Sequence, residues 1–164
     1  MPANETTPGI VIAEETHASI FFAAVMALPA VTELVAAVLI PNTAARVALV
    51  IGGVLMLGGA ALAASGFHYL FTRSGVEIRT LGLPLLLIPA SSIQSYAVDR
   101  WSWRGGYGIR GLGSRRGYVW SNTGVRIRTA KSDIFLGHSD PERLIRDLDM
   151  IRQTSEGNAE TRSF

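Results

Sequence analysis

The sequence predicts an α+β membrane protein, in which a transmembrane hairpin of two helices precedes a small antiparallel β domain covered by a C-terminal helix. Three observations predict this fold. Charged residues make up only 17% of the 164 residues, less than the quarter that is usual in soluble proteins. The apolar residues are concentrated in two long segments near the N-terminus. Short apolar runs broken by Gly and Pro follow, and then one amphipathic segment.

These patterns divide the chain into four expected parts. They are a polar N-terminal tail over 1–17, the transmembrane hairpin over 18–71, the cytoplasmic β domain with its C-terminal helix over 72–153, and a flexible tail over 154–164.

The hairpin is predicted by two apolar segments, Ala18 to Ile40 and Val47 to Phe71. Each is long enough for the roughly 20 residues that a helix needs to cross a bilayer. Pro41 begins a short polar connection and ends the first helix, so the two helices are expected to be antiparallel neighbours. A cleavable signal peptide is the alternative for the first segment. The residues before it contain no Lys or Arg, the reverse of a signal peptide's basic beginning.

The basic residues predict the orientation of the hairpin. None of the 15 Lys and Arg residues precedes the first helix, Arg46 lies in the connection, and the others follow the second helix. Since cytoplasmic segments carry an excess of basic residues, both termini are expected to be cytoplasmic. Arg73 and Arg79 contribute most to this prediction because they follow the second helix closely.

Two features of the hairpin suggest contacts inside the membrane. Glu33 lies in the first span, where a carboxylate is costly and marks a functional hypothesis, although a protonated or paired carboxylate is favoured over a transport role. Small residues form a stripe on the second span, which lets another helix approach closely. They are Gly52, Gly59, Ala63 and Gly66. Packing within the hairpin is slightly favoured over self-association into a homo-oligomer, and the sequence does not separate the two.

Short apolar runs after His68 predict the strands of the β domain. The runs lie at 76–81, 83–88, 93–101, 118–120, 125–129 and 133–137. Val125 and Ile127 alternate with polar residues, which indicates one buried and one exposed face. The short intervals between the runs favour an antiparallel sheet or small barrel over βαβ units.

The sequence from Ser139 to Glu142 predicts the start of the C-terminal helix. Ser139 or Asp140 is expected to cap the helix, and Pro141 suits its first turn. An apolar stripe is expected to cover the sheet. It consists of Leu144, Ile145, Leu148 and Ile151. The solvent side is expected to carry Arg143, Arg146, Asp147, Asp149 and Arg152.

Several glycine and aromatic landmarks carry a resemblance to a known family. The runs are 105–110 (GGYGIR), 117–121 (GYVWS), 124–127 (GVRI) and 137–144 (GHSDPERL). With the hairpin, they resemble bacterial membrane-anchored proteins that have a pleckstrin-homology-like (PH-like) domain. The likeness covers about residues 67–153 and the anchor. It implies a bacterial plasma (inner) membrane protein with a partly open β-barrel or sandwich that binds lipids or proteins and does not catalyse a reaction.

One departure from the resemblance concerns lipid specificity. Many eukaryotic pleckstrin-homology domains bind phosphoinositides through an Arg-x-Arg pattern in the first hairpin. Arg73 and Arg79 do not form that pattern, and Arg126-Ile127-Arg128 falls in a later strand. An inositol-phosphate site is therefore not carried over.

Residues from Trp101 to Trp120 are expected to form a long exposed loop that is rich in glycine, aromatic and basic residues. Indole rings favour the membrane interface, and each guanidinium near anionic lipid contributes roughly 1 kcal/mol. The candidate lipid- or partner-binding residues are Arg100, Trp101, Trp103, Arg104, Tyr107, Arg110, Arg115 and Arg116. Tyr118 and Trp120 are more easily explained as core residues. An acidic protein is an alternative ligand, and single-stranded nucleic acid is the least favoured because the net charge is only +2.

The sequence favours neither an enzyme nor a cofactor or metal site. There is no Cys, and His17, His68 and His138 are far apart and fit no metal-binding spacing. Gly106 to Gly111 matches G-x-G-x-x-G, but the glycine-rich residues that follow do not open the helix that a dinucleotide site needs. The favoured function is a membrane-tethered binding or scaffolding protein. The alternative is an accessory or assembly subunit of a larger membrane complex that acts through its transmembrane helices.

Overall fold

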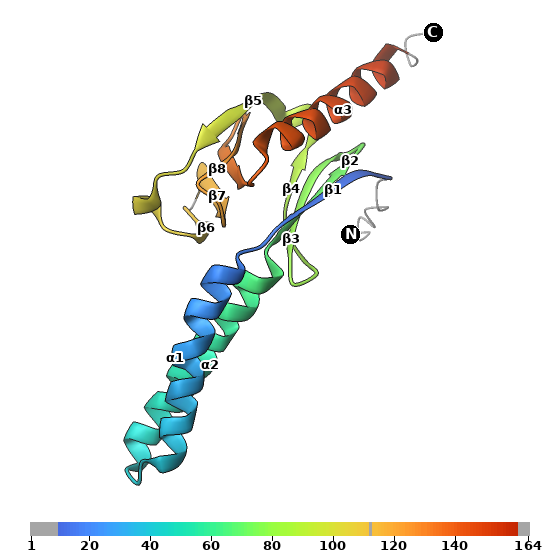
Figure 1. The fold of residues 1–164 in the computed structure, drawn as a ribbon. Coiled ribbons are helices and arrows are strands. Elements are labelled where there is room, and N and C mark those ends of the chain that lie inside the picture. Colours follow the sequence, from blue (N-terminus) through green and yellow to red (C-terminus); the bar gives the residue numbers. More distant parts are fainter. Residues whose placement is uncertain (1–9, 112, 161–164) are drawn as a thin grey trace. The chain divides into compact units, whose positions relative to one another are not determined.

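The computed structural model describes residues 10–111 and 113–160, which form two compact units (Figure 1). The helical unit consists of 18–66, and the β unit is formed by the chain on both sides of it. The prediction of a polar tail over 1–17 is therefore wrong where the structure describes it, because Val11–His17 is the first strand, β1. The hairpin is an insertion in the β unit, between its first and second strands.

The helical unit consists of α1, Ile20–Leu39, and α2, Thr43–Ser65, which lie side by side and antiparallel. Ser19 and Asn42 cap the two helices, since their side chains accept hydrogen bonds from Phe22 N and Ala45 N. Both helices are long and apolar enough to cross a membrane, with mean hydropathies of 2.1 and 2.3.

The second apolar segment ends earlier as a helix than the sequence predicts. α2 ends at Ser65, and Gly66 caps it with a positive φ of 68°, a backbone region that glycine adopts without steric cost. The following strand β2, Phe67–Thr72, buries alternate side chains at its start. The expected hairpin over 18–71 therefore included most of a strand, and the β domain begins before residue 72.

Sheet A contains four antiparallel strands in the order β1-β2-β3-β4. β3 is Gly75–Thr80 and β4 is Leu83–Pro89. Gly75 is required at the tight β2–β3 turn, because its φ is +144° and an added Cβ would lie 2.0 Å from Ile88 O.

Sheet B contains five strands in the order β5-β8-β9-β7-β6. They are β5, Ile93–Arg100; β6, Gly108–Arg110; β7, Arg115–Val119; β8, Thr123–Thr129; and β9, Asp133–Gly137. β7 and β9 are parallel, so the prediction of a wholly antiparallel sheet is wrong for this pair. The expected exposed loop from 101 to 120 is also wrong, because β6 and β7 form a hairpin within it.

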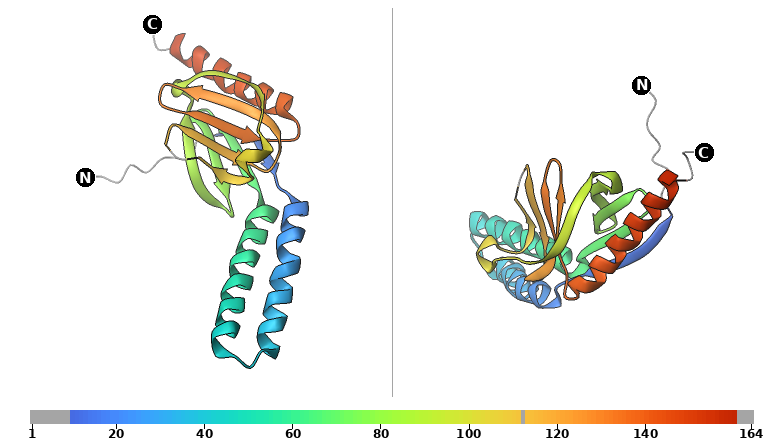
Figure 2. Two further views of the ribbon diagram at one scale, coloured as in Figure 1. Left: turned by 90° about the vertical axis from the view of Figure 1, so that its left-hand side faces the viewer. Right: turned by 90° about the horizontal axis from the view of Figure 1, so that it is seen from above.

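The core of the β unit lies between the two sheets and α3, Pro141–Glu160 (Figure 2). Two short 3₁₀ helices, η1 at Ala90–Ser92 and η2 at Trp103–Gly105, connect the strands. α3 contacts strands of both sheets, and it buries the predicted residues Leu144, Leu148 and Ile151. Asp140 caps it as predicted, accepting a hydrogen bond from Arg143 N. The helix extends beyond the expected end at Gln153, and 161–164 lie outside the described residues.

Tyr69 joins the two sheets through its buried hydroxyl group, which lies 3.0 Å from Gly137 O and 3.2 Å from Tyr118 O. The side chain is fully buried, and burial raises the pKa of the phenol far above its ordinary value. The neutral hydroxyl therefore acts as a donor from sheet A to sheet B.

We predict that Tyr69→Phe lowers the free energy of unfolding by about 1–3 kcal/mol, because buried carbonyl groups lose their donor. Tyr107→Phe is the matched control, since the Tyr107 hydroxyl donates to Asn122 Oδ1 at the surface. Tryptophan fluorescence during urea unfolding of the detergent-solubilised chain measures the effect, because all three Trp residues lie in the β unit. Equal stability of the two variants would contradict this role for Tyr69.

Candidate functional site

The strongest charge asymmetry of the chain lies in residues 100–131, which we call the basic segment. It contains eight of the 15 Lys and Arg residues and no Asp or Glu, although the whole chain has 13 acidic residues. Seven of the eight basic side chains are exposed. These are Arg100, Arg104, Arg110, Arg115, Arg116, Arg128 and Lys131. Such a concentration of one sign produces a local positive potential that attracts anions.

Three of the exposed arginines belong to the β6–β7 hairpin. Arg110 ends β6 and pairs with Gly117, while Arg115 and Arg116 begin β7. Arg116 Nε also donates to Gly113 O at 3.1 Å, which fixes part of its side chain near the turn. The regular strand backbone therefore presents guanidinium groups that the sequence placed on a flexible loop.

Trp101 is half-buried and packs on sheet B, while its predicted lipid contact stays a prediction. Its ring lies 5.3 Å from the ring of Phe135, and its Nε1 donates to Gly106 O at 2.9 Å. A Cβ added at Gly105 or Gly117 would lie only 2.7 or 2.9 Å from the indole. The two glycines therefore leave the space that the indole occupies against sheet B.

The other aromatic side chains near the basic segment also have structural contacts. Tyr107 is half-buried and donates to Asn122 Oδ1 at 2.6 Å. Tyr118 is buried and Trp120 stacks on Phe67 with ring centroids 5.9 Å apart, as the core alternative predicted. The side chain of Trp103 lies outside the described residues. The exposed side chains described in this segment are therefore mainly basic, while Tyr107, Tyr118 and Trp120 make contacts within the β unit.

Arg126 is the half-buried member of the basic segment and pairs with Asp99. Burial alone would raise the pKa of Asp99, but the hydrogen bond from Arg126 and that from Arg100 N hold it below its ordinary value. Asp99 thus neutralises Arg126 and leaves the exposed members of the basic segment as its positive surface.

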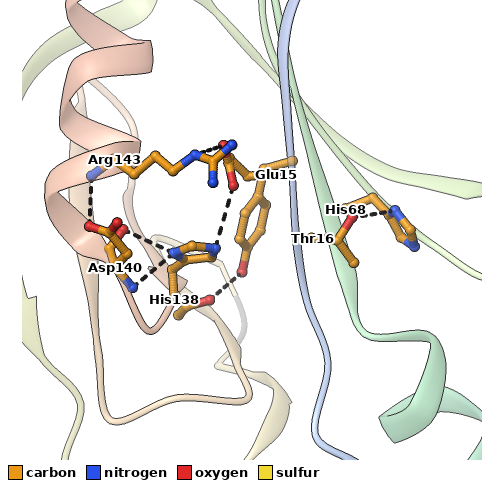
Figure 3. Close-up of polar contacts among 8 residues, drawn as sticks. Glu15, Thr16, His68, His138, Asp140 and Arg143 are labelled. Carbon is orange, nitrogen blue, oxygen red and sulfur yellow. Dashed lines mark hydrogen bonds and ion pairs between the residues drawn. The ribbon is translucent and has the colours of Figure 1, made fainter.

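A second group of polar residues lies where β1 meets α3 (Figure 3), and two of its members, Glu15 and His138, are buried. Glu15 is only 6% exposed, and its Oε1 accepts from Arg143 Nε while its Oε2 lies 3.7 Å from His138 Nε2. His138 Nδ1 lies 3.0 Å from Asp140 N and 2.9 Å from Asp140 O, so the ring is held against the start of α3. We call Glu15, His138 and Arg143 the polar cluster. It connects β1 to the first turn of α3. Arg143 is exposed as predicted, and it also pairs with Glu15.

Two of the three histidines come together, although their sequence spacing suggested that none would. The rings of His17 and His138 have centroids 5.3 Å apart. Burial, and then the nearby His138, lowers the pKa of His17. His68 lies elsewhere and contacts Thr16 Oγ1 at 3.0 Å. Within the described part of the chain, no group of three or more His, Asp or Glu side chains is placed to hold a metal ion.

Asp147 is buried, so its predicted place on the solvent side of α3 is wrong. It is 6% exposed, and its Oδ2 has no hydrogen-bond partner among the residues that the structure describes. Burial, and then the charge of Glu15, raises the pKa of Asp147. Asp149 does lie at the surface as predicted, where it accepts a hydrogen bond from the Tyr96 hydroxyl.

The outer face of sheet A has a groove of about 420 Å³. It is lined by Val11, Glu14, His68, Leu70, Thr72, Glu77, Arg79 and Gly82. Within the groove, Arg79 Nε pairs with Glu77 Oε1 at 2.9 Å, and His68 Nδ1 lies 3.6 Å from Glu14 Oε1.

In the helical unit, the predicted stripe of small residues faces α1. A Cβ added at Gly52 would lie 2.6 Å from Glu33 Oε2, and one at Gly59 would lie 2.3 Å from the Met26 methyl group. Ala63 is buried, whereas Gly66 has a different role as the helix cap. These contacts favour packing within the hairpin, and self-association stays a prediction. Glu33 Oε2 has no hydrogen-bond partner in the described part of the unit.

We predict that Asp147→Asn raises the free energy of unfolding at pH 7. The pKa of Asp147 is higher in the folded than in the unfolded chain, so the wild-type protein loses stability as pH rises from the ordinary value of 3.8 through the folded pKa. Asn does not ionise, and its advantage should shrink as the solution is acidified through the same range.

Urea unfolding of the full chain in detergent, repeated between pH 4 and 7, measures this difference. Asp149→Asn is the control, because Asp149 lies two residues away on the same helix but is exposed. An Asp147→Asn variant whose stability parallels the wild type at every pH would contradict the unfavourable burial of this carboxylate.

We compared the chain with models of protein families, with curated proteins and with solved structures. None of the three comparisons gave a match. What supports a function is therefore the charge, exposure and contacts of the residues described above.

Proposed function

We propose that this chain is a membrane-tethered, non-catalytic binding module whose basic segment binds anionic lipid headgroups. The observation that carries the proposal is the set of seven exposed basic side chains in a segment without acidic residues. Six of them are arginines, and guanidinium groups match the geometry of phosphate through paired hydrogen bonds. A phosphate-rich membrane surface is the anionic ligand nearest to a tethered domain.

The tether itself is supported by the length and composition of α1 and α2. β1 precedes the hairpin and β2 follows it, and the two strands pair with each other. That pairing requires both ends of the hairpin to emerge on one side of a membrane that it crosses. The excess of basic residues after the hairpin favours the cytoplasmic side for both termini. The family resemblance implies that the membrane is a bacterial plasma membrane.

The topology of the β unit supports a PH-like domain as the binding scaffold. Four antiparallel strands form sheet A, then β5, β8 and β9 form an antiparallel part of sheet B, and a C-terminal helix follows. The β6–β7 hairpin is an addition between β5 and β8. It carries Arg110, Arg115 and Arg116, so the proposed contact lies mainly on the added hairpin rather than on the strands of the first sheet.

The other candidate functions have less support. Gly52 and Gly59 face α1, so they leave less of the stripe for another membrane subunit. The polar cluster consists of groups that satisfy one another, which supports a structural rather than a catalytic role. An acidic partner protein would bind the same positive surface as lipid. A direct measurement of lipid binding distinguishes these two ligands.

We predict that changing Arg110 and Arg115 together to Ser weakens binding of phosphatidylglycerol by roughly 30-fold, because each basic residue near an anionic surface contributes about 1 kcal/mol. The measurement is a titration of the full chain in neutral detergent with phosphatidylglycerol, followed by native mass spectrometry of the bound lipid. Added salt should weaken wild-type binding, since exposed charges are screened.

The matched control changes Arg73 and Arg146 to Ser, two exposed arginines outside the basic segment that give the same change in net charge. This control should bind phosphatidylglycerol nearly as the wild type does. Equal losses of binding in both variants would show that only the net charge matters and would contradict a site in the basic segment. Equal wild-type binding of phosphatidylcholine and phosphatidylglycerol would contradict recognition of anionic lipid and favour a partner protein.

A further inference from the structure

The turn between β3 and β4 has an unusual residue in a strained position. Leu81 has a φ of +50°, and it is the one residue other than glycine with positive φ among those described. Gly or Asn commonly occupies such a position, because the Cβ of an L-residue lies too close to the following carbonyl oxygen there, and only Gly or a locally hydrogen-bonding Asn tolerates this readily. Leu81 is also 52% exposed, so burial in the β unit does not account for it.

The residues around this turn are apolar as well. Leu83 is 64% exposed, and residues 80–98 contain no Asp, Glu, Lys, Arg or His. By contrast, the turn at the opposite end of β3, which connects β2 to β3, contains Arg73 and Ser74. Single exposed leucines are common on protein surfaces. A leucine with positive φ in an uncharged stretch is unusual, and an apolar environment outside the β unit would stabilise its side chain. We call residues 81–84 the leucine turn.

The strand register places the leucine turn at one particular end of sheet A. His17 pairs with Phe67, His68 pairs with Arg79, and Thr80 pairs with Leu83. The turn therefore lies at the same end of the sheet as His17 and Phe67. These are the two points where the chain leaves the sheet for the hairpin: two residues separate β1 from α1, and one separates α2 from β2.

We propose that the leucine turn inserts into the interfacial region of the bilayer that the hairpin spans, with Leu81 and Leu83 in contact with the lipid acyl chains. The inference rests on the proposed membrane tether and adds an apolar contact to it. The short links keep this end of the sheet near the membrane, where apolar side chains at the boundary of headgroups and acyl chains are stabilised by leaving water. The leucine turn is uncharged, as such insertion requires.

Because the sequence has no Cys, single cysteines allow site-specific labelling in the full chain. Leu83→Cys, Ser74→Cys and Leu57→Cys, each carrying an environment-sensitive fluorophore, are reconstituted into phosphatidylcholine nanodiscs in which the acyl chains are brominated near the headgroup. Leu57 is an exposed residue of α2 and reports the tether. Bromine quenches only fluorophores that reach the acyl chains.

We expect quenching at positions 83 and 57 and none at position 74. Quenching at 57 without quenching at 83 would overturn the insertion of the leucine turn and leave the tether intact. No quenching at any of the three positions would overturn both. Equal quenching at 83 and 74 would also contradict the inference, because opposite ends of the sheet would then meet lipid equally.

A second variant separates membrane contact from a role in folding. Leu81→Asn suits the positive φ and removes the apolar side chain. It should leave urea unfolding in detergent unchanged or shift it to higher urea, while the fluorophore at position 83 loses quenching in the nanodiscs. Unchanged quenching would mean that Leu81 does not hold the turn in the bilayer, and would count against the proposal.

Discussion

The pairing of β1 with β2 is the constraint on which the rest of the β unit depends. In the sequence, β1 precedes the helical hairpin and β2 follows it, yet His17 pairs with Phe67. The hairpin makes this possible, because Ser19 N donates to Ala63 O at 2.9 Å and so holds its two ends together. Once α1 and α2 are packed, joining the strands costs little additional loop-closure entropy. Formation of the helical hairpin and of the β unit is therefore coupled in folding.

β1 is fixed on its other side by the polar cluster. A buried carboxylate is costly unless it is paired and hydrogen-bonded, and Glu15 meets this condition with Arg143 and His138. Because Arg143 lies in the first turn of α3, the same contact fixes the start of that helix. Asp147, one turn later, has no such partner for its Oδ2 among the described residues. The region thus combines a carboxylate that is paired and a carboxylate whose Oδ2 has no hydrogen bond to any residue described.

The sequence predicted the features whose signals are local. Asp140 and Pro141 announced α3, and the stripe beginning at Leu144 identified its buried face. β1 was missed because Glu14 and Glu15 make it look polar, and the partners that bury Glu15 lie more than 120 residues away. A continuous apolar run has no period, so Phe67–Phe71 was assigned to a membrane helix.

The basic surface was predicted in part. Its arginines were identified by composition, but Trp101 was placed on the surface because nothing in the sequence shows that Gly105 and Gly117 leave room for its ring. Arg128 and Lys131 were left out, although the absence of acidic residues from 100 to 131 includes them. The parallel pairing of β7 with β9 depends on tertiary contacts and has no signal in the spacing of strands.

The proposed contacts need not be strong, because the proposed tether would hold the β unit close to the lipid that it binds. A domain held at a surface by a short link experiences a high effective concentration of that surface. Contributions of about 1 kcal/mol from each arginine then select the orientation and the lipid composition that the domain prefers, rather than deciding whether it is bound. In the proposed arrangement, the uncharged leucine turn and the basic segment contact different layers of the same membrane, the first the acyl chains and the second the phosphates. Two weak contacts of different chemistry on one tethered unit therefore define an orientation better than a single strong one.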